Sequence, residues 1–191
     1  MAIMNDGVEE LLGPLATYRP RSLWDGALRN AAVLIPFLAD TNQLVFTLRS
    51  QQLKHHAGQI SFPGGRVEPL ESPWQAALRE AHEEVGISPD HVTKIGRLDD
   101  VLSPRGYHIR CYVGLVHHFV PRINHDEVER LVLVELDELF DTGLHSVRKW
   151  KGIHDVHYFD FRQGTVWGVT GLITHRLREI LGIRAGDPPP A

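Results

Sequence analysis

The sequence predicts an α/β protein in which helices cover a mixed β-sheet. Short apolar segments bounded by turn-forming residues, such as 31–38 and 43–50, have the composition of β-strands. Residues 73–85 instead repeat apolar side chains at the spacing of a helix. Strands and helices do not alternate in the regular order of a doubly wound parallel sheet, so a mixed sheet covered by helices fits best.

The order of the elements follows from the same patterns. Residues 8–15 predict a short helix, and residues 55–65 predict a loop around a short strand. The later elements are expected to be a helix over 73–85, strands over 93–98, 109–116 and 129–136, a short helical segment over 137–141, a hairpin of 156–161 and 165–168, and a final helix over 171–181.

The helix over 73–85 has clear boundary signals. Ser72 is suited to cap its N-terminus, Pro73 is tolerated at the first helical position, and Gly86 ends the helix. Its apolar face consists of Trp74, Ala77, Leu78, Ala81 and Val85.

Composition excludes several classes of protein. The chain has 191 residues, 42% of them hydrophobic and 23% charged, which suits one globular domain of ordinary size. Its formal net charge of −4 argues against a protein that mainly coats nucleic acid. Cys111 is the only cysteine, so neither an internal disulfide nor a cysteine-based zinc site can form.

The apolar segments also bear on location. The longest, at 31–39, is too short to cross a bilayer, and the N-terminus lacks the pattern of a signal peptide. We therefore expect a cytoplasmic protein with neither a membrane nor a nucleic-acid partner. The expected organisation is an N-terminal extension over 1–26, one domain over 27–184 and a disordered tail over 185–191; the oligomeric state is left open.

Three glutamates crowd the end of the helix. Glu80, Glu83 and Glu84 fall within an arc of roughly 100°, and each like-charge pair costs about 0.2–0.5 kcal/mol. The apolar face points elsewhere, so we expect these carboxylates to be displayed together rather than buried. Two interpretations follow: a solvated helix face, or oxygen ligands for a divalent cation such as Mg²⁺ that bridges to a diphosphate.

The residues around these glutamates favour the second interpretation. The segment GRVEPLESPWQAALREAHEEVGI at 65–87 resembles the Nudix box of the Nudix hydrolases at every fixed position: Gly65, Glu71, Arg79, Glu80, Ala81, Glu83, Glu84, Gly86 and Ile87. The resemblance implies the Nudix α/β/α sandwich and hydrolysis of a diphosphate with Mg²⁺ or Mn²⁺ as cofactor.

The resemblance also assigns roles. The Gly64 carbonyl, Glu80, Glu83 and Glu84 are implied to contact the metal, which activates a water for attack on phosphorus. Glu71 and Arg79 are implied to orient the loop and the glutamates through charge-assisted hydrogen bonds.

The segment before the box indicates a substrate. VFTLRSQQLKHHAGQISFPGG at 45–65 resembles the motif that precedes the box in coenzyme A pyrophosphatases, and the likeness extends over roughly residues 30–182. It implies cleavage of coenzyme A or its derivatives to 3′,5′-ADP and 4′-phosphopantetheine. Lys54 replaces an arginine of that motif, which keeps the charge but loses the planar fork suited to phosphate. The candidates for binding substrate phosphates are Arg49, Lys54, Arg66 and Arg105.

Outside the box, Glu127 is the best candidate for a further metal ligand or general base, and its alternative is an ordinary loop glutamate. None of the twelve histidines is expected to be catalytic; the adjacent pairs 55–56 and 117–118 cannot chelate by themselves, because neighbours on an extended chain point to opposite sides.

Two rival functions stay open. One is a Nudix hydrolase of another nucleoside diphosphate derivative such as ADP-ribose or NADH, or of a nucleoside triphosphate, for which Lys54 leaves room. The other is a module that binds a nucleotide without cleaving it, which the intact glutamates oppose.

Overall fold

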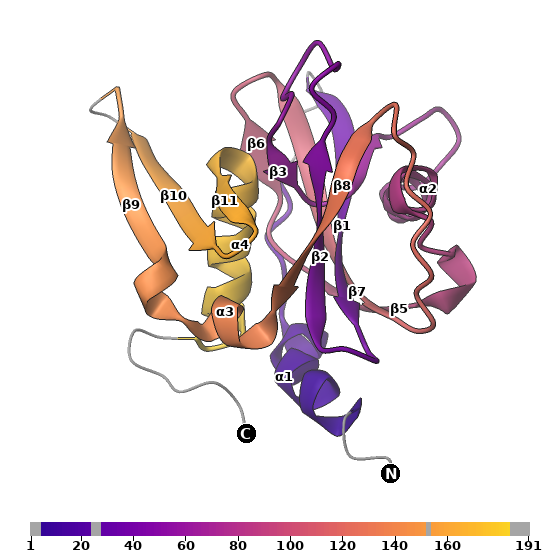
Figure 1. Cartoon of the computed structure of the whole chain (residues 1–191), viewed down its shortest axis with the longest axis vertical. Coiled ribbons are helices and arrows are strands. Elements are labelled where there is room, and N and C mark those ends of the chain that lie inside the picture. The colour runs from indigo at the N-terminus through magenta and orange to yellow at the C-terminus, as the bar shows by residue number, and fades with distance from the viewer. Residues whose placement is uncertain (1–4, 24–27, 152–153, 184–191) are drawn as a thin grey trace.

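The computed structural model describes residues 5–23, 28–151 and 154–183. A large mixed sheet forms the centre of the molecule, with helix α2 on one face and helix α4, together with a small second sheet, on the other (Figure 1). This three-layer arrangement confirms the predicted α/β/α sandwich.

The large sheet has eight strands. They are β1 (Arg29–Leu38), β2 (Gln43–Arg49), β3 (Ile60–Ser61), β4 (Gly64–Arg66), β5 (Val92–Arg97), β6 (Val101–Ser103), β7 (Tyr107–Val116) and β8 (Val128–Glu135). The main path is β3-β2-β1-β7-β5, with β4 paired to β1, β6 to β7 and β8 to β2. The sheet is mixed because β1 and β7 run parallel along their whole length, whereas the other pairs are antiparallel.

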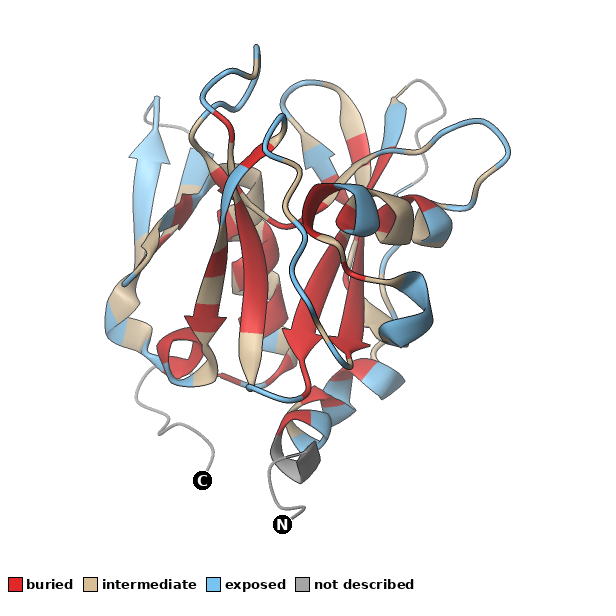
Figure 2. Cartoon of the chain, turned by 45° about the vertical axis from the view of Figure 1, so that its right-hand side comes forward, coloured by how far each residue is buried: buried red, intermediate tan, exposed pale blue. Residues whose placement is uncertain are grey.

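Helix α2 (Pro73–Val85) covers one face of this sheet. Its buried alanines, Ala76, Ala77 and Ala81, belong to one apolar cluster with side chains of β1, β2 and β7. Small side chains on this face let the helix lie close to the strands, and Figure 2 shows the buried side of α2 turned toward the sheet. The predicted boundaries of this helix, 73–85, are those of the structure.

The opposite face is covered by three further elements. Helix α1 (Asn5–Thr17), helix α4 (Gly168–Ile180) and the small sheet all contribute to a second apolar cluster. The small sheet orders its strands β11-β10-β9, which are β9 (His145–Trp150), β10 (His154–Phe161) and β11 (Gly164–Trp167). The shorter elements are α3 (Leu136–Phe140) and the 3-10 turns Pro89–His91 and Thr142–Leu144.

Several elements differ from the sequence prediction. Strands β4, β6 and β9 are additional, and α4 begins at Gly168 rather than at residue 171. The predicted hairpin is present as β10 and β11. Helix α1 packs into the core through Val8, Leu12 and Leu15. The predicted division into an N-terminal extension, a domain and a tail stays a prediction. The predicted tail over 185–191 lies outside the described residues. None of the helices in the described ranges is long and apolar enough to span a bilayer.

Candidate metal and catalytic site

The position of α2 is fixed at both ends. Ser72 accepts a hydrogen bond from the Gln75 amide, and the Gln75 side chain accepts one from the Ser72 amide, which together form a capping box. Gly86 ends the helix in the left-handed conformation at φ 81°. These caps hold the helix in one register, so its carboxylates have fixed starting points.

Strand β4 brings two glycines against the helix. A Cβ atom on Gly65 would collide with the Glu80 carboxylate, and one on Gly64 would lie 2.7 Å from the Cα of Val33 on β1. Gly64 also has φ 153°, a conformation that side chains disfavour. The two glycines therefore allow β4 to lie between β1 and the carboxylates of α2.

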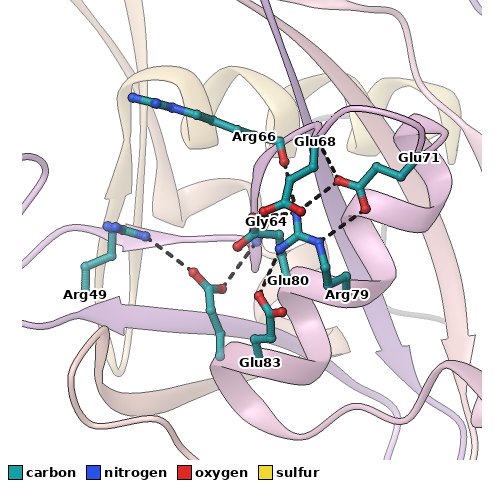
Figure 3. Close-up of polar contacts among 9 residues, drawn as sticks. Arg49, Gly64, Arg66, Glu68, Glu71, Arg79, Glu80 and Glu83 are labelled. Carbon is teal, nitrogen blue, oxygen red and sulfur yellow. Dashed lines mark hydrogen bonds and ion pairs between the residues drawn. The ribbon is translucent and has the colours of Figure 1, made fainter.

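Arg79 organises the carboxylates around it (Figure 3). Its guanidinium donates two hydrogen bonds to Glu71, at 3.2 and 3.0 Å, and one to the Arg66 carbonyl at 3.1 Å. The same group lies 3.1 Å from Glu80 and 2.9 Å from Glu83. These hydrogen bonds, donated by Arg79 and accepted by Glu71, lower the pKa of Glu71 and raise the pKa of Arg79. Arg79 thus joins the loop before α2 to two of its glutamates.

Glu84 points away from this network, into the protein. Its side chain is 2% exposed and accepts a hydrogen bond from the Gly64 amide at 3.3 Å. Arg49, at the end of β2, lies 3.5 Å from the other carboxylate oxygen. Burial raises the pKa of Glu84 to about 8, with further raising by Glu80 and Glu127, although Arg49 and the Gly64 amide oppose the rise. The expectation that the three glutamates are displayed rather than buried is therefore wrong for Glu84.

The exposure of the three glutamates is graded. Glu83 has 53% of its side chain exposed and Glu80 has 16%. Burial raises the pKa of Glu80 against the lowering effect of Arg79, and the negative charges of Glu83 and Glu127 add to the rise. Glu84 is buried because it follows Ala77 by seven positions, which returns it to nearly the same side of the helix.

Glu127 lies within the electrostatic reach of the same site. Its charge raises the pKa of both Glu80 and Glu84. The loop that carries it is anchored at two points, since the Asn124 amide donates to the Glu84 carbonyl and the Ser50 amide donates to the Glu127 carbonyl. The structure therefore brings Glu127 to the glutamates of α2 from a distant part of the sequence.

These side chains suit a hard divalent cation. After burial, the charge of Glu127 raises the pKa of both Glu80 and Glu84, and the charge of Glu80 raises that of Glu84 further, so negative charge is in excess here despite Arg49 and Arg79. Carboxylate oxygens are the ligands that Mg²⁺ and Mn²⁺ prefer. A bound divalent cation would compensate for the buried charge of Glu84, which is costly without one.

The four candidate phosphate-binding residues occupy different places. Arg49 contacts Glu84 within the site, and its Nε is buried without a hydrogen-bond partner among the described residues. Lys54 is exposed in the loop between β2 and β3. The Arg66 Nε donates to the Tyr107 hydroxyl at 3.1 Å, and Arg105 is exposed in the turn between β6 and β7.

Sequence reasoning missed two residues that hold candidate site residues in place. Tyr107 holds Arg66 through its hydroxyl and stacks under Arg29, whose guanidinium carbon is 4.5 Å from the ring centroid. Asn124 anchors the loop of Glu127 to α2. Two hollows of the described part of the chain lie away from these residues, one beside α4 and one beside α1.

Comparison with known proteins identifies the family. Residues 28–164 match the family model of the NUDIX domain. The chain is 38% identical to the uncharacterized Nudix hydrolase NudL of Pectobacterium atrosepticum over 157 residues, which cover 78% of this chain and 81% of that protein. It is 35% identical to the NudL protein of Yersinia pestis over 168 residues, 81% of each chain. In fold it resembles the crystal structure of DR0079 from Deinococcus radiodurans, with a TM-score of 0.55, 17% identity, and coverage of 80% of this chain and 87% of that one. The chain therefore belongs to the Nudix family.

Proposed function

We propose that the chain hydrolyses the pyrophosphate bond of coenzyme A or its derivatives, giving 3′,5′-ADP and 4′-phosphopantetheine. Membership of the Nudix family supports hydrolysis of a nucleoside diphosphate derivative with a divalent cation. The narrower substrate rests on the segment at 45–65, which resembles the motif of coenzyme A pyrophosphatases. Mg²⁺ or Mn²⁺ as the cofactor and a cytoplasmic location belong to the same proposal.

One contact carries this proposal. Arg49 belongs to the coenzyme A-type segment, and its guanidinium lies 3.5 Å from Glu84 of the box. The two sequence motifs thus meet in space, at a carboxylate that is almost completely buried. The Arg49 side chain is 23% exposed, so the accessible part of its guanidinium beside this carboxylate is suited to bind a phosphate oxygen of a substrate that reaches the site.

The proposed roles of the other residues follow from their contacts. Arg79 holds Glu71, Glu80 and Glu83 in place through its fork of donors. The Gly64 amide and Arg49 fix the orientation of Glu84. These interactions set the carboxylate positions before a ligand arrives, so little ordering is needed when the ligand binds.

Glu80, Glu83, Glu84 and the backbone at Gly64 would hold the cation. When bound, it neutralises charge on the diphosphate and lowers the pKa of a coordinated water. Glu127 is the proposed further ligand or general base. Arg66, Lys54 and Arg105 are the candidates for the 3′-phosphate of the adenosine half, because each presents its cationic side chain on the outside of the same domain.

The test is a product assay on purified protein with Mg²⁺ or Mn²⁺. Coenzyme A, ADP-ribose, NADH and a nucleoside triphosphate are incubated in parallel, and the products are separated by chromatography. Glu84→Gln protein prepared in the same way controls for contaminating hydrolases.

Release of 3′,5′-ADP from coenzyme A well ahead of the other substrates is the expected result. Cleavage of another diphosphate without cleavage of coenzyme A would refute coenzyme A as the substrate but would leave the proposed metal site standing. Inertness toward all four would favour a module that binds a nucleotide without cleaving it.

A further inference from the structure

Three histidines meet on the face of the molecule opposite α2. They are His145 on β9, His157 on β10 and His175 on α4, and one ring nitrogen from each lies within 4.8 Å of the others. No other group of three histidine, cysteine or acidic residues in the described ranges converges as closely. Figure 1 shows α4 lying beside β10 and β11 on the side of the large sheet away from α2.

The small sheet places the first two histidines side by side. His157 pairs with Val147 and His145 pairs with Phe159, so the two histidines are diagonal neighbours on one face of β9 and β10. Their ring nitrogens, Nε2 of His145 and Nδ1 of His157, are 3.0 Å apart. At that separation one nitrogen donates a hydrogen bond and the other accepts it, which requires at least one neutral imidazole.

The third histidine reaches the pair because α4 lies unusually close to β10. A Cβ atom on Gly171 would collide with the His157 carbonyl, so only glycine permits this approach. His175 follows Gly171 by four positions and therefore lies one turn further along the same side of the helix. Its ring stacks on that of His157 with centroids 3.9 Å apart.

The protonation state suits metal binding. Burial, followed by the neighbouring histidines, lowers the pKa of His157 to about 4, and the same causes together with Arg178 lower that of His145. Neutral imidazole is the form that ligates metals. The positive charge of Arg178 disfavours a cation at this position. The negative charges of Asp155, which raises the pKa of His157, and of Glu179 favour one.

From this arrangement we propose that His145, His157 and His175 bind a divalent transition-metal ion of the zinc class. Imidazole nitrogens suit Zn²⁺ and its neighbours rather than Mg²⁺, so this site is distinct in chemistry from the carboxylates of α2. Zinc is known to bind three protein ligands and one water in a four-coordinate arrangement. The ion would tie α4 to the small sheet.

The rings must turn to take up an ion. Zn²⁺–nitrogen bonds of about 2.0–2.1 Å place tetrahedral ligand nitrogens roughly 3.3–3.5 Å apart, close to the spacing of the His145–His157 pair. The rings are nearly parallel, however, and an ion must lie in the plane of each imidazole. Rotation about χ2, which is a broad torsion, can turn the rings toward one ion, and it gives up the stacking of His175 on His157 and of His145 on Phe159.

Glu179 supplies a partner for one of these ligands. Its carboxylate lies 3.6 Å from the His175 Nε2, one helical turn away on α4. A carboxylate that accepts a hydrogen bond from a metal-bound imidazole orients the ring and raises its basicity, and a slightly closer approach by Glu179 would make that bond. With 29% of the His175 side chain exposed, the cluster is also open to an ion from solution.

The test is a zinc titration of untagged, metal-stripped protein followed by calorimetry. Millimolar Mg²⁺ is present throughout, so that the acidic site is occupied by its own class of ion. His157→Gln and His175→Gln remove one ligand each, and His154→Gln on the same strand β10 is the matched control because His154 is exposed and outside the cluster.

Wild type and His154→Gln are expected to bind one Zn²⁺ per chain at micromolar concentration or tighter, and the two cluster variants are expected to lose this binding. Glu179→Gln should weaken it by roughly 10–100-fold. Absence of binding to wild type, or unchanged binding in both cluster variants, would overturn the proposal. Should the variants fail to fold, histidine ¹⁵N spectra of wild type decide, since zinc must shift His145, His157 and His175 and leave the other imidazoles unmoved.

Discussion

Replacement of Glu84 by glutamine is expected to stabilise the metal-free protein at pH 8 while removing most of its hydrolase activity. The folded protein raises the pKa of this carboxyl group from 4.5 to about 8, chiefly by burial. Between these two values the folded state therefore binds a proton that the unfolded state has released. Stability from this group is complete below pH 4.5 and is lost progressively as the pH rises toward 8.

The size of the effect follows from the change in pKa. Each pKa unit corresponds to about 1.4 kcal/mol, so the loss between pH 5 and pH 8 is on the order of 4 kcal/mol. No discount for solvent applies, because the side chain is 2% exposed. Glutamine has no charge to desolvate and keeps an oxygen that can accept the Gly64 amide. A gain of about 4 kcal/mol would raise Tm by roughly 8–16 °C for a protein of this size.

The assay is thermal and urea unfolding in EDTA from pH 5 to pH 8, for wild type and Glu84→Gln. Comparing the two proteins cancels the titrating groups that do not interact with Glu84, including the histidines. Glu83→Gln is the matched control, since it removes the same charge from the same helix at a position that is 53% exposed. Addition of Mg²⁺ or Mn²⁺ should stabilise wild type more at pH 8 than at pH 5, and should stabilise Glu84→Gln much less.

Two results would refute this reasoning. A stability difference between wild type and Glu84→Gln that does not grow with pH would show that the carboxyl group titrates normally in the folded protein. An unchanged hydrolysis rate at saturating metal would remove Glu84 from the metal site.

Three other substitutions test the remaining contacts. Arg79→Lys keeps the charge but loses the planar guanidinium that hydrogen-bonds both Glu71 and the Arg66 carbonyl. We expect kcat to fall by about tenfold or more and the metal concentration for half-maximal rate to rise. An unchanged metal dependence would contradict the orienting role of Arg79. Gly65→Ala should displace the Glu80 carboxylate and reduce activity severely with the circular dichroism spectrum retained, and full activity would show that β4 moves freely from α2. Lys54→Arg should preserve coenzyme A cleavage with an equal or lower KM, whereas complete loss would mean that Lys54 has a role other than phosphate binding.

The parts of the fold that could be predicted are those with local signals. Helix α2 has a capping residue, a proline at its first position and a terminal glycine, and its boundaries matched. Strand β9 has none of these signals, because the sequence HSVRKW is mostly polar and four of its six residues are exposed. An edge strand of this kind is specified by its partner β10 rather than by its own apolar pattern.

The histidine cluster could not be predicted for the same reason. His145 and His157 become neighbours only through the register of β9 and β10, and β9 itself has no strand signal. His175 joins them only because Gly171 permits a close contact between α4 and β10. Adjacent histidines in the sequence gave no guidance, since the three residues that meet are far apart along the chain.

The acidic site shows the same division between local and distant contributions. Residue type and spacing on α2 are sufficient to place Glu80, Glu83 and Glu84 near one another. The raised pKa of Glu84 comes chiefly from burial, and it is limited by Arg49, which precedes Glu84 by 35 positions, and by the Gly64 amide, which precedes it by 20. Both partners are positioned by the large sheet, through the pairing of β4 with β1 and of β2 with β1. The same carboxyl group on an isolated helix would titrate near 4.5, so the property that makes it a strong candidate for a cation is conferred by the sheet.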